Sequence, residues 1–178
     1  MIIGGYYVIP PHSFPTHDFG NYYFSALFIK QGIFTSEIYF PFHFNQTVAD
    51  LGYVNQFLSF APNTPFLALF FVPFTFLPLA TAKLVFNLIS LLLLMVSLKR
   101  LASHLNIHWG YVLIFPLVFL VPIKNNLLFG QVYFLLFFLL SEGFLAYQKN
   151  QFIRTALWWG LAISLKVFPI VLIGFLLF

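Results

Sequence analysis

From residue 51 to its end, the chain carries one acidic side chain, Glu142, among long runs of Leu, Phe, Val and Ile. Hydrophobic types make up 61% of the whole chain and charged types 7%, whereas a soluble domain has about 25% charged residues. Because an ionised side chain is costly inside a bilayer, a chain that nearly omits such residues is suited to lipid. We therefore predict an integral membrane protein with an all-α, polytopic fold.

The apolar stretches in the second part of the chain predict about four transmembrane helices. A helix over 80–98 would be about 28 Å long, which is enough to cross a bilayer. The stretch 65–78 is shorter and contains Pro73, so a re-entrant or interfacial helix is expected there. The predicted spans are 80–98, 109–123, 132–147 and the segment from 155 onward, with a polar turn at 124–126.

Basic residues favour cytoplasmic loops, and the chain places them at 99–100 and again within the loop 148–154. Two predicted spans separate these positions, so both can lie on the cytoplasmic side. The loop 124–131 and the region 1–65 are then expected on the non-cytoplasmic side.

The first 65 residues differ in composition from the rest, since they hold three of the four acids. We expect residues 1–65 to form a non-cytoplasmic loop region with juxtamembrane helices, and residues 66–178 to form a transmembrane helical region. Within the first part, "DFGNYYFSALFIKQG" has helical spacing, with Gly32 as its predicted C-cap. The chain ends at Phe178 inside an apolar run, which indicates a truncated span in a fragment of a longer protein.

Four motifs occur in a characteristic order. They are "DFGNYYFSALFIKQG", a proline-bounded apolar stretch beginning "PFLALFF", "GQVYFLLFFLLSEGFLA", and "ALWWGLAISLKVFPIVLIGFLLF" with its Lys-x-x-Pro. Over about residues 15–178, this pattern resembles glycosyltransferase family 87, a family of polytopic enzymes of the GT-C type. In this chain Tyr133 follows "GQV", where the family usually has Asn.

The resemblance implies transfer of a hexose, with mannose expected, from a polyprenyl phosphate donor to a glycan or lipid acceptor. It implies a multi-pass protein of the plasma (inner) membrane, with its active site on the non-cytoplasmic side. No cofactor is expected, and the absence of an Asp-x-Asp pair is consistent with a metal-independent transferase. The net charge is +4, but no basic cluster extends beyond 99–100, so nucleic acid is not an expected partner.

Asp18 is the candidate catalytic residue. Sugar transfer needs a base that takes the proton of the acceptor hydroxyl, and Asp18 matches the acid of the family's first outer loop. The alternative is structural, because Asp is also favoured as the N-cap of a helix such as the one predicted here.

Three lysines are candidate substrate-binding residues, because a departing phosphate needs cations near it. Lys124 lies in the predicted outer loop, and Lys83 lies near the outer end of its span. Lys166 lies in the middle of the last predicted span, where a charge marks a functional path or has a partner. A structural pair between Lys166 and Glu142 is the alternative to phosphate binding.

Gln131 and Tyr22 complete the candidate substrate-binding residues. The amide of Gln131 can hydrogen-bond sugar hydroxyls, or it can simply be a polar residue at a helix start. Tyr22 can stack on a sugar ring, although a place in the interfacial aromatic belt is favoured. The alternative function is a membrane transporter or channel segment, with Glu142 and Lys166 lining a pathway, or a structural membrane subunit.

Overall fold

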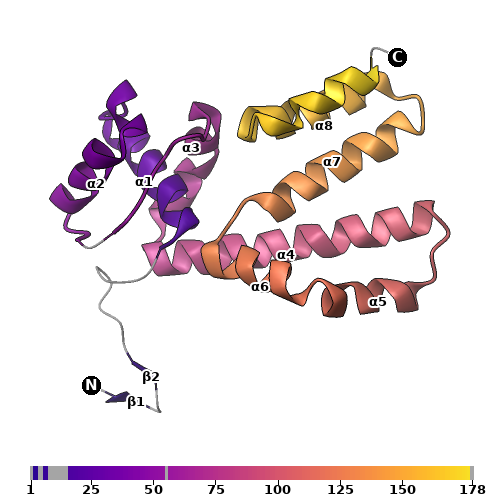
Figure 1. Cartoon of the computed structure of the whole chain (residues 1–178), viewed down its shortest axis with the longest axis horizontal. Coiled ribbons are helices and arrows are strands. Elements are labelled where there is room, and N and C mark those ends of the chain that lie inside the picture. Colours follow the sequence, from indigo (N-terminus) through magenta and orange to yellow (C-terminus); the bar gives the residue numbers. More distant parts are fainter. Residues whose placement is uncertain (1, 4–5, 8–15, 55, 177–178) are drawn as a thin grey trace. The chain divides into compact units, whose positions relative to one another are not determined.

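The computed structural model describes residues 2–3, 6–7, 16–54 and 56–176 (Figure 1). Strands β1 (Ile2–Ile3) and β2 (Tyr6–Tyr7) pair antiparallel as a two-residue ladder. From residue 16 onward, all regular structure in the described part of the chain is helical, which confirms the helical fold class. The expected truncation at Phe178 lies outside the described residues.

The chain divides into two compact units. The first unit consists of Met1–Pro62 and Ala68–Leu84, and the second of Asn63–Leu67 and Val85–Phe178. The described part of the first unit contains α1 (Asp18–Gln31), the 3₁₀ segment η2 (Ser36–Tyr39) and α2 (Pro41–Asp50). It also contains the end of α3 (Pro65–Phe71) and η3 (Val72–Phe76).

Helix α1 forms where its apolar spacing predicts it. It ends at Gly32, whose φ of 71° is left-handed, and the N–H of Gly32 donates to the carbonyl of Ile29 at 3.1 Å. A residue without a Cβ adopts this conformation at little cost, so the predicted C-cap is confirmed.

Aromatic side chains form the core of the first unit. Phe28 and Phe44 meet edge to face at 5.3 Å between ring centroids, and both are fully buried. Asn45 ties the following loop to α2, because its Nδ2 donates to the carbonyl of Leu58 at 2.7 Å and its Oδ1 accepts from the Leu58 N–H at 2.9 Å.

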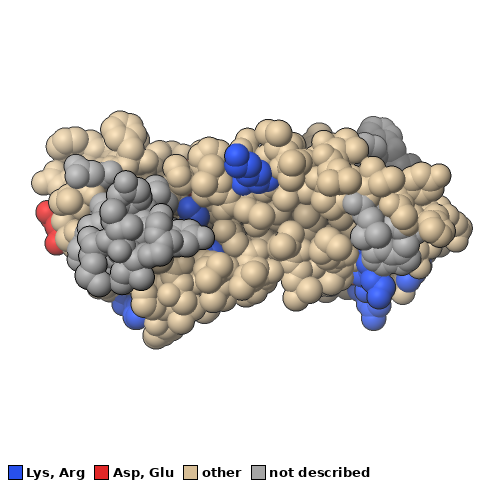
Figure 2. Space-filling model, turned by 90° about the horizontal axis from the view of Figure 1, so that it is seen from below, with Lys and Arg blue, Asp and Glu red and all other residues tan. Residues whose placement is uncertain are grey.

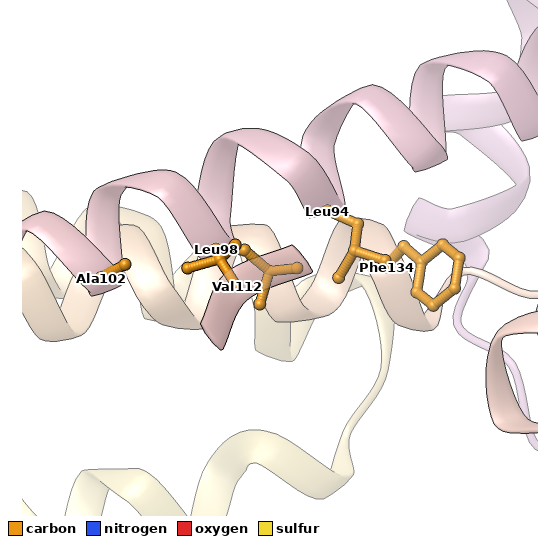
Figure 3. Close-up of a cluster of buried hydrophobic side chains, with 5 residues drawn as sticks. All are labelled: Leu94, Leu98, Ala102, Val112 and Phe134. Atoms are coloured by element: carbon orange, nitrogen blue, oxygen red, sulfur yellow. The ribbon is translucent and has the colours of Figure 1, made fainter. Parts of the chain in front are cut away.

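The second unit is built from longer apolar helices. Leu94, Leu98 and Ala102 project from α4 toward Val112 of α5 and Phe134 of α7 (Figure 3). The face in Figure 2 shows few charged side chains. The helices of this unit are most of α4 (Leu79–His104), α5 (Trp109–Val118), α6 (Leu120–Phe129), α7 (Tyr133–Tyr147), α8 (Phe152–Leu165) and η4 (Phe168–Leu176).

Prolines set two helix ends that the sequence analysis placed wrongly. The stretch 109–123, expected as a shorter span, is broken, because α5 stops at Val118 and α6 leaves it at an angle of 66°. Pro122 has no N–H for the carbonyl four residues earlier, and its ring crowds that carbonyl. The expected polar turn at 124–126 is also wrong, since these residues lie inside α6.

The same rule ends α8, because Pro169 follows Leu165 by four residues. The segment from 155 onward, expected as a span, is therefore an α-helix followed by the 3₁₀ segment η4. Thr64 donates its hydroxyl to the carbonyls of Ser164 and Leu165 at this end, which satisfies groups that the helix leaves open.

One described helix, α4, is long and apolar enough to cross a membrane, and α5 with α6 would be a second if they form one broken span. Helices α7 and α8 have 15 and 14 residues, fewer than the roughly 20 that a straight span needs. The structure thus supports a membrane protein with one clear span candidate.

Candidate functional site

The first unit brings Asp18 and Lys83 into one group of charges, although 65 positions separate them in the sequence (83 − 18). Lys83 lies in the second turn of α4 and is only 7% exposed. Its Nζ donates to the carbonyl of Thr16 at 3.4 Å. We call Thr16, His17, Asp18 and Lys83 the Asp18 cluster.

The pKa of His17 is affected by the charges of both Lys83 and Asp18. Partial burial lowers its pKa from the usual 6.5, the nearby ammonium of Lys83 lowers it further, and the carboxylate of Asp18 raises it. Both charges therefore act on the same imidazole, which supports the spatial grouping of the cluster.

The start of α1 fixes where the carboxylate of Asp18 lies. The N-cap position belongs to His17, with φ of 51° and no side-chain cap, so the interpretation of Asp18 as the N-cap is wrong by one residue. Asp18 stands instead in the first turn, where the helix dipole favours a negative charge. Its side chain is partly exposed, so a substrate hydroxyl can reach it.

A hydrogen bond to a distant residue and a close approach to α1 hold the segment before α1 in place. The hydroxyl of Thr16 donates to Oε1 of Gln56 at 2.8 Å. A Cβ on Gly20 would lie 2.3 Å from Oγ1 of Thr16, so only glycine lets Thr16 approach α1 this closely. The carbonyl that accepts from Lys83 is positioned by these contacts.

Lys166 is the C-cap of α8, between that helix and η4, and not inside one continuous helix. Its Nζ donates to the hydroxyl of Tyr133 at 3.1 Å and lies 4.5 Å from the centre of that ring. Tyr133 was not among the predicted site residues.

The expected alternative of a Lys166–Glu142 pair is wrong. Glu142 on α7 pairs with Arg100 on α4, at 2.6 Å between Oε1 and Nε. The side chain of Glu142 is 9% exposed and that of Arg100 is 51% exposed. The sequence indicated that Glu142 needs a cationic partner. It did not indicate which cation, because apolar helices give no sequence signal for how two distant helices align.

The remaining predicted residues lie in different surroundings. Tyr22 is 2% exposed and its ring lies 5.1 Å from that of Phe71, which makes it the least accessible of the candidates. Lys124 is exposed on α6. Gln131 is half-buried just beyond α6, and its N–H donates to the carbonyl of Asn126 at 2.9 Å.

An apolar groove of about 230 Å³ opens in the second unit beside Tyr133. It is formed where α5 and α6 bend away from each other, and α4 and α7 supply its other walls. Its walls include Leu94, Phe115, Phe119, Ile123, Phe134 and Phe137. An apolar chain fits this lining better than a sugar does, because the walls offer almost no hydrogen-bonding groups.

Comparison with known proteins yields one family. The model of glycosyltransferase family 87 matches residues 60–178, well over half of the chain. The match includes Lys83, Lys124, Gln131 and Lys166, whereas Asp18 precedes it. No curated protein and no solved structure matched. The chain therefore belongs to glycosyltransferase family 87, a family of membrane-associated enzymes that transfer sugars.

Proposed function

We propose that the Asp18 cluster is the catalytic site for transfer of a hexose from a polyprenyl phosphate to a glycan or lipid hydroxyl. One observation carries this assignment: the partly exposed carboxylate of Asp18 lies close enough to the buried ammonium of Lys83 for the two charges to interact electrostatically. The carboxylate has the chemistry of a general base, and the ammonium has that of a phosphate partner.

The proposed step balances as a single displacement. The acceptor oxygen forms a bond to C1 of the donor sugar while the bond from C1 to the phosphate oxygen breaks. The phosphate takes the bonding electron pair, and the hydroxyl proton passes to the carboxylate of Asp18. Lys83 stabilises the negative charge that develops on the phosphate.

The second unit, taken by itself, also carries groups that suit a polyprenyl phosphate. The apolar groove beside Tyr133 has the lining that a prenyl chain requires. Lys166, Lys124 and Gln131 are further candidates for contacts with phosphate or sugar. Mannose is the first sugar to test, since the resemblance implies it.

The membrane orientation is proposed from α4. Lys83 lies near its N-terminal end, and Lys99 lies 16 residues later, about 24 Å along the helix axis. Basic residues favour the cytoplasmic side, so Lys83 and the Asp18 cluster are assigned to the opposite side. We extend this to a multi-pass protein of the plasma (inner) membrane with its site on the non-cytoplasmic face.

The test is sugar transfer in membranes that contain the full chain. Radiolabelled mannose is supplied as polyprenyl phosphate mannose, and Asp18→Asn is compared with the unchanged chain. Because a general base contributes about 10²-fold or more to the rate, Asp18→Asn should lower the rate of transfer by at least about 10²-fold. Asp50→Asn is the matched control, because Asp50 is an exposed acid at the end of α2 in the same unit.

Each outcome has a distinct meaning. Loss of transfer in Asp18→Asn alone, at equal protein level, supports the base assignment. Transfer that survives in Asp18→Asn removes Asp18 from the chemistry. No transfer by the unchanged chain with several prenyl phosphate sugars would favour the transporter or channel alternative.

A further inference from the structure

Half of the eight basic residues gather in one region of the second unit. Lys99 and Arg100 lie near the end of α4, Lys149 lies in the α7–α8 loop, and Arg154 lies in the first turn of α8. All four side chains are exposed. We call these four residues the basic cluster.

Two adjoining cavities connect the members of the basic cluster. The larger, of about 350 Å³, is lined by Lys99, Arg100 and Lys149 together with Ser103 and His104. The smaller, of about 100 Å³, is lined by Arg100, Lys149 and Arg154 with Glu142 and Trp158. Since Arg100 and Lys149 line both, the cavities form one basic hollow.

Glu142 contacts one of the cations of this hollow, and the net charge of the hollow stays positive. It is the single carboxylate after residue 50, and it contacts Nε of Arg100 at 2.6 Å. About half of the Arg100 side chain remains exposed (51%). The four cations that line the hollow therefore outnumber its one nearly buried carboxylate, and the exposed side of the hollow favours an anion.

Exposed apolar side chains border the basic cluster. Phe152 is 59% exposed and Ile153 is 80% exposed, and both directly precede Arg154. Phe144 on α7 is also exposed. Lys99 itself follows the apolar run of α4 at once. A small soluble anion has no use for such a border, whereas a phospholipid places its phosphate directly beside acyl chains.

We propose that the basic cluster binds the headgroup phosphate of an anionic phospholipid, with Arg100 and Lys149 as the central contacts. Basic hollows between helices at a membrane boundary have the chemistry for such headgroups. This assignment is independent of the sugar-transfer site, because it uses none of the residues of the Asp18 cluster.

The experiment uses the full chain reconstituted in phosphatidylcholine vesicles. Phosphatidylglycerol or phosphatidylcholine with brominated acyl chains is added to a Trp109→Phe background, so that quenching reports lipid near Trp158, which lines the hollow, and its buried neighbour Trp159. We expect phosphatidylglycerol to quench at a lower mole fraction than phosphatidylcholine.

The variant is Lys149→Gln, and Lys30→Gln is its matched control. Both lysines are exposed, and both changes lower the net charge by one, but Lys30 lies at the end of α1. Removal of one basic contact predicts about a fivefold loss of the preference for phosphatidylglycerol. The preference should stay unchanged in Lys30→Gln.

Equal quenching by the two brominated lipids would overturn the proposal, and so would an equal loss of the preference for phosphatidylglycerol in Lys149→Gln and Lys30→Gln. It would also be overturned if added unbrominated polyprenyl phosphate relieved the quenching and added unbrominated phosphatidylglycerol did not. Circular dichroism checks that Lys149→Gln is folded. If it is not, Arg154→Gln replaces it, with the same expected fall in preference.

Discussion

The two units bury opposite charges and expose opposite partners. In the first unit a buried ammonium, Lys83, interacts with the more accessible carboxylate of Asp18. In the second unit a buried carboxylate, Glu142, pairs with the half-exposed guanidinium of Arg100. The accessible member of each pair defines the available chemistry. An exposed carboxylate accepts a proton, and an exposed guanidinium attracts an anion.

The largest expected effect comes from breaking the pair of the second unit. Arg100→Gln leaves Glu142 buried without its cation, which should cost about 3 kcal/mol of unfolding free energy, near the lower end for loss of one partner in a buried pair. Glu142→Gln should cost less, since it removes the buried charge itself. Denaturant unfolding in detergent measures both.

Arg154→Gln is the control for Arg100→Gln, because Arg154 is exposed and donates a hydrogen bond to an exposed neighbour, Gln151. A loss of stability in Arg154→Gln equal to that in Arg100→Gln would mean that total charge, and not the pair with Glu142, stabilises this unit.

The next effect concerns the packing that holds Glu142 in place. A Cβ on Gly143 would lie 2.2 Å from the ring of Trp159, whereas a Cβ on Gly160 would meet nothing within 4 Å. Gly143→Ala should therefore destabilise the second unit by about 1–3 kcal/mol through overpacking. Gly160→Ala is the matched control and should be neutral or stabilising. Equal unfolding midpoints for the two variants would contradict this packing.

A smaller effect is expected at the end of α8, which presents Lys166 to Tyr133. Thr64→Val removes the donor to the carbonyls of Ser164 and Leu165, at a cost of about 1 kcal/mol. Thr47→Val is the control, because Thr47 donates to a carbonyl within its own exposed helix. The free energy of unfolding of the two variants is measured in detergent. An equal decrease in both would contradict a capping role of Thr64 at the end of α8.

The smallest effect is a pH dependence in the first unit. Partial burial and the charge of Lys83 lower the pKa of His17, so the folded state favours the neutral imidazole. The contribution of His17 to stability is complete above the unfolded value of about 6.5. It is lost as the pH falls from there through the lower folded pKa. Stability should therefore decrease on acidification through this window.

An NMR titration of His17 sharpens the same point. Lys83→Gln removes one cause of the lowered pKa, so the midpoint of His17 should rise. Asp18→Asn removes the charge that opposes it, so the midpoint should fall. If the titration midpoint of His17 is the same in Lys83→Gln as in the unchanged chain, Lys83 does not belong to the Asp18 cluster.

Local signals in the sequence predicted local structure well. The helical spacing and Gly32 predicted α1 and its end, and the stretch 80–98 lies inside α4. The motif order predicted the family. These features depend on residues that are close together in the sequence, so the sequence alone predicts them.

Contacts between distant segments were not predicted. Glu142 clearly needed a cation, but Arg100 and Lys166 were equally available to it by composition. Lys83 was a candidate only for phosphate, and its approach to Asp18 depends on how the segment before α1 packs. The helix ends at Val118 and Leu165 were also missed, although Pro122 and Pro169, four residues later in each case, are local signals for them.

The central claim is that Asp18 and Lys83 act as one catalytic unit. A double-mutant cycle on kcat/KM tests it most directly, with Asp18→Asn, Lys83→Gln and the double variant in sugar transfer from a polyprenyl phosphate donor. Because groups that act together are not additive, we expect the double variant to be about as slow as the slower single variant. Losses that multiply would contradict this account and leave the two residues with separate roles.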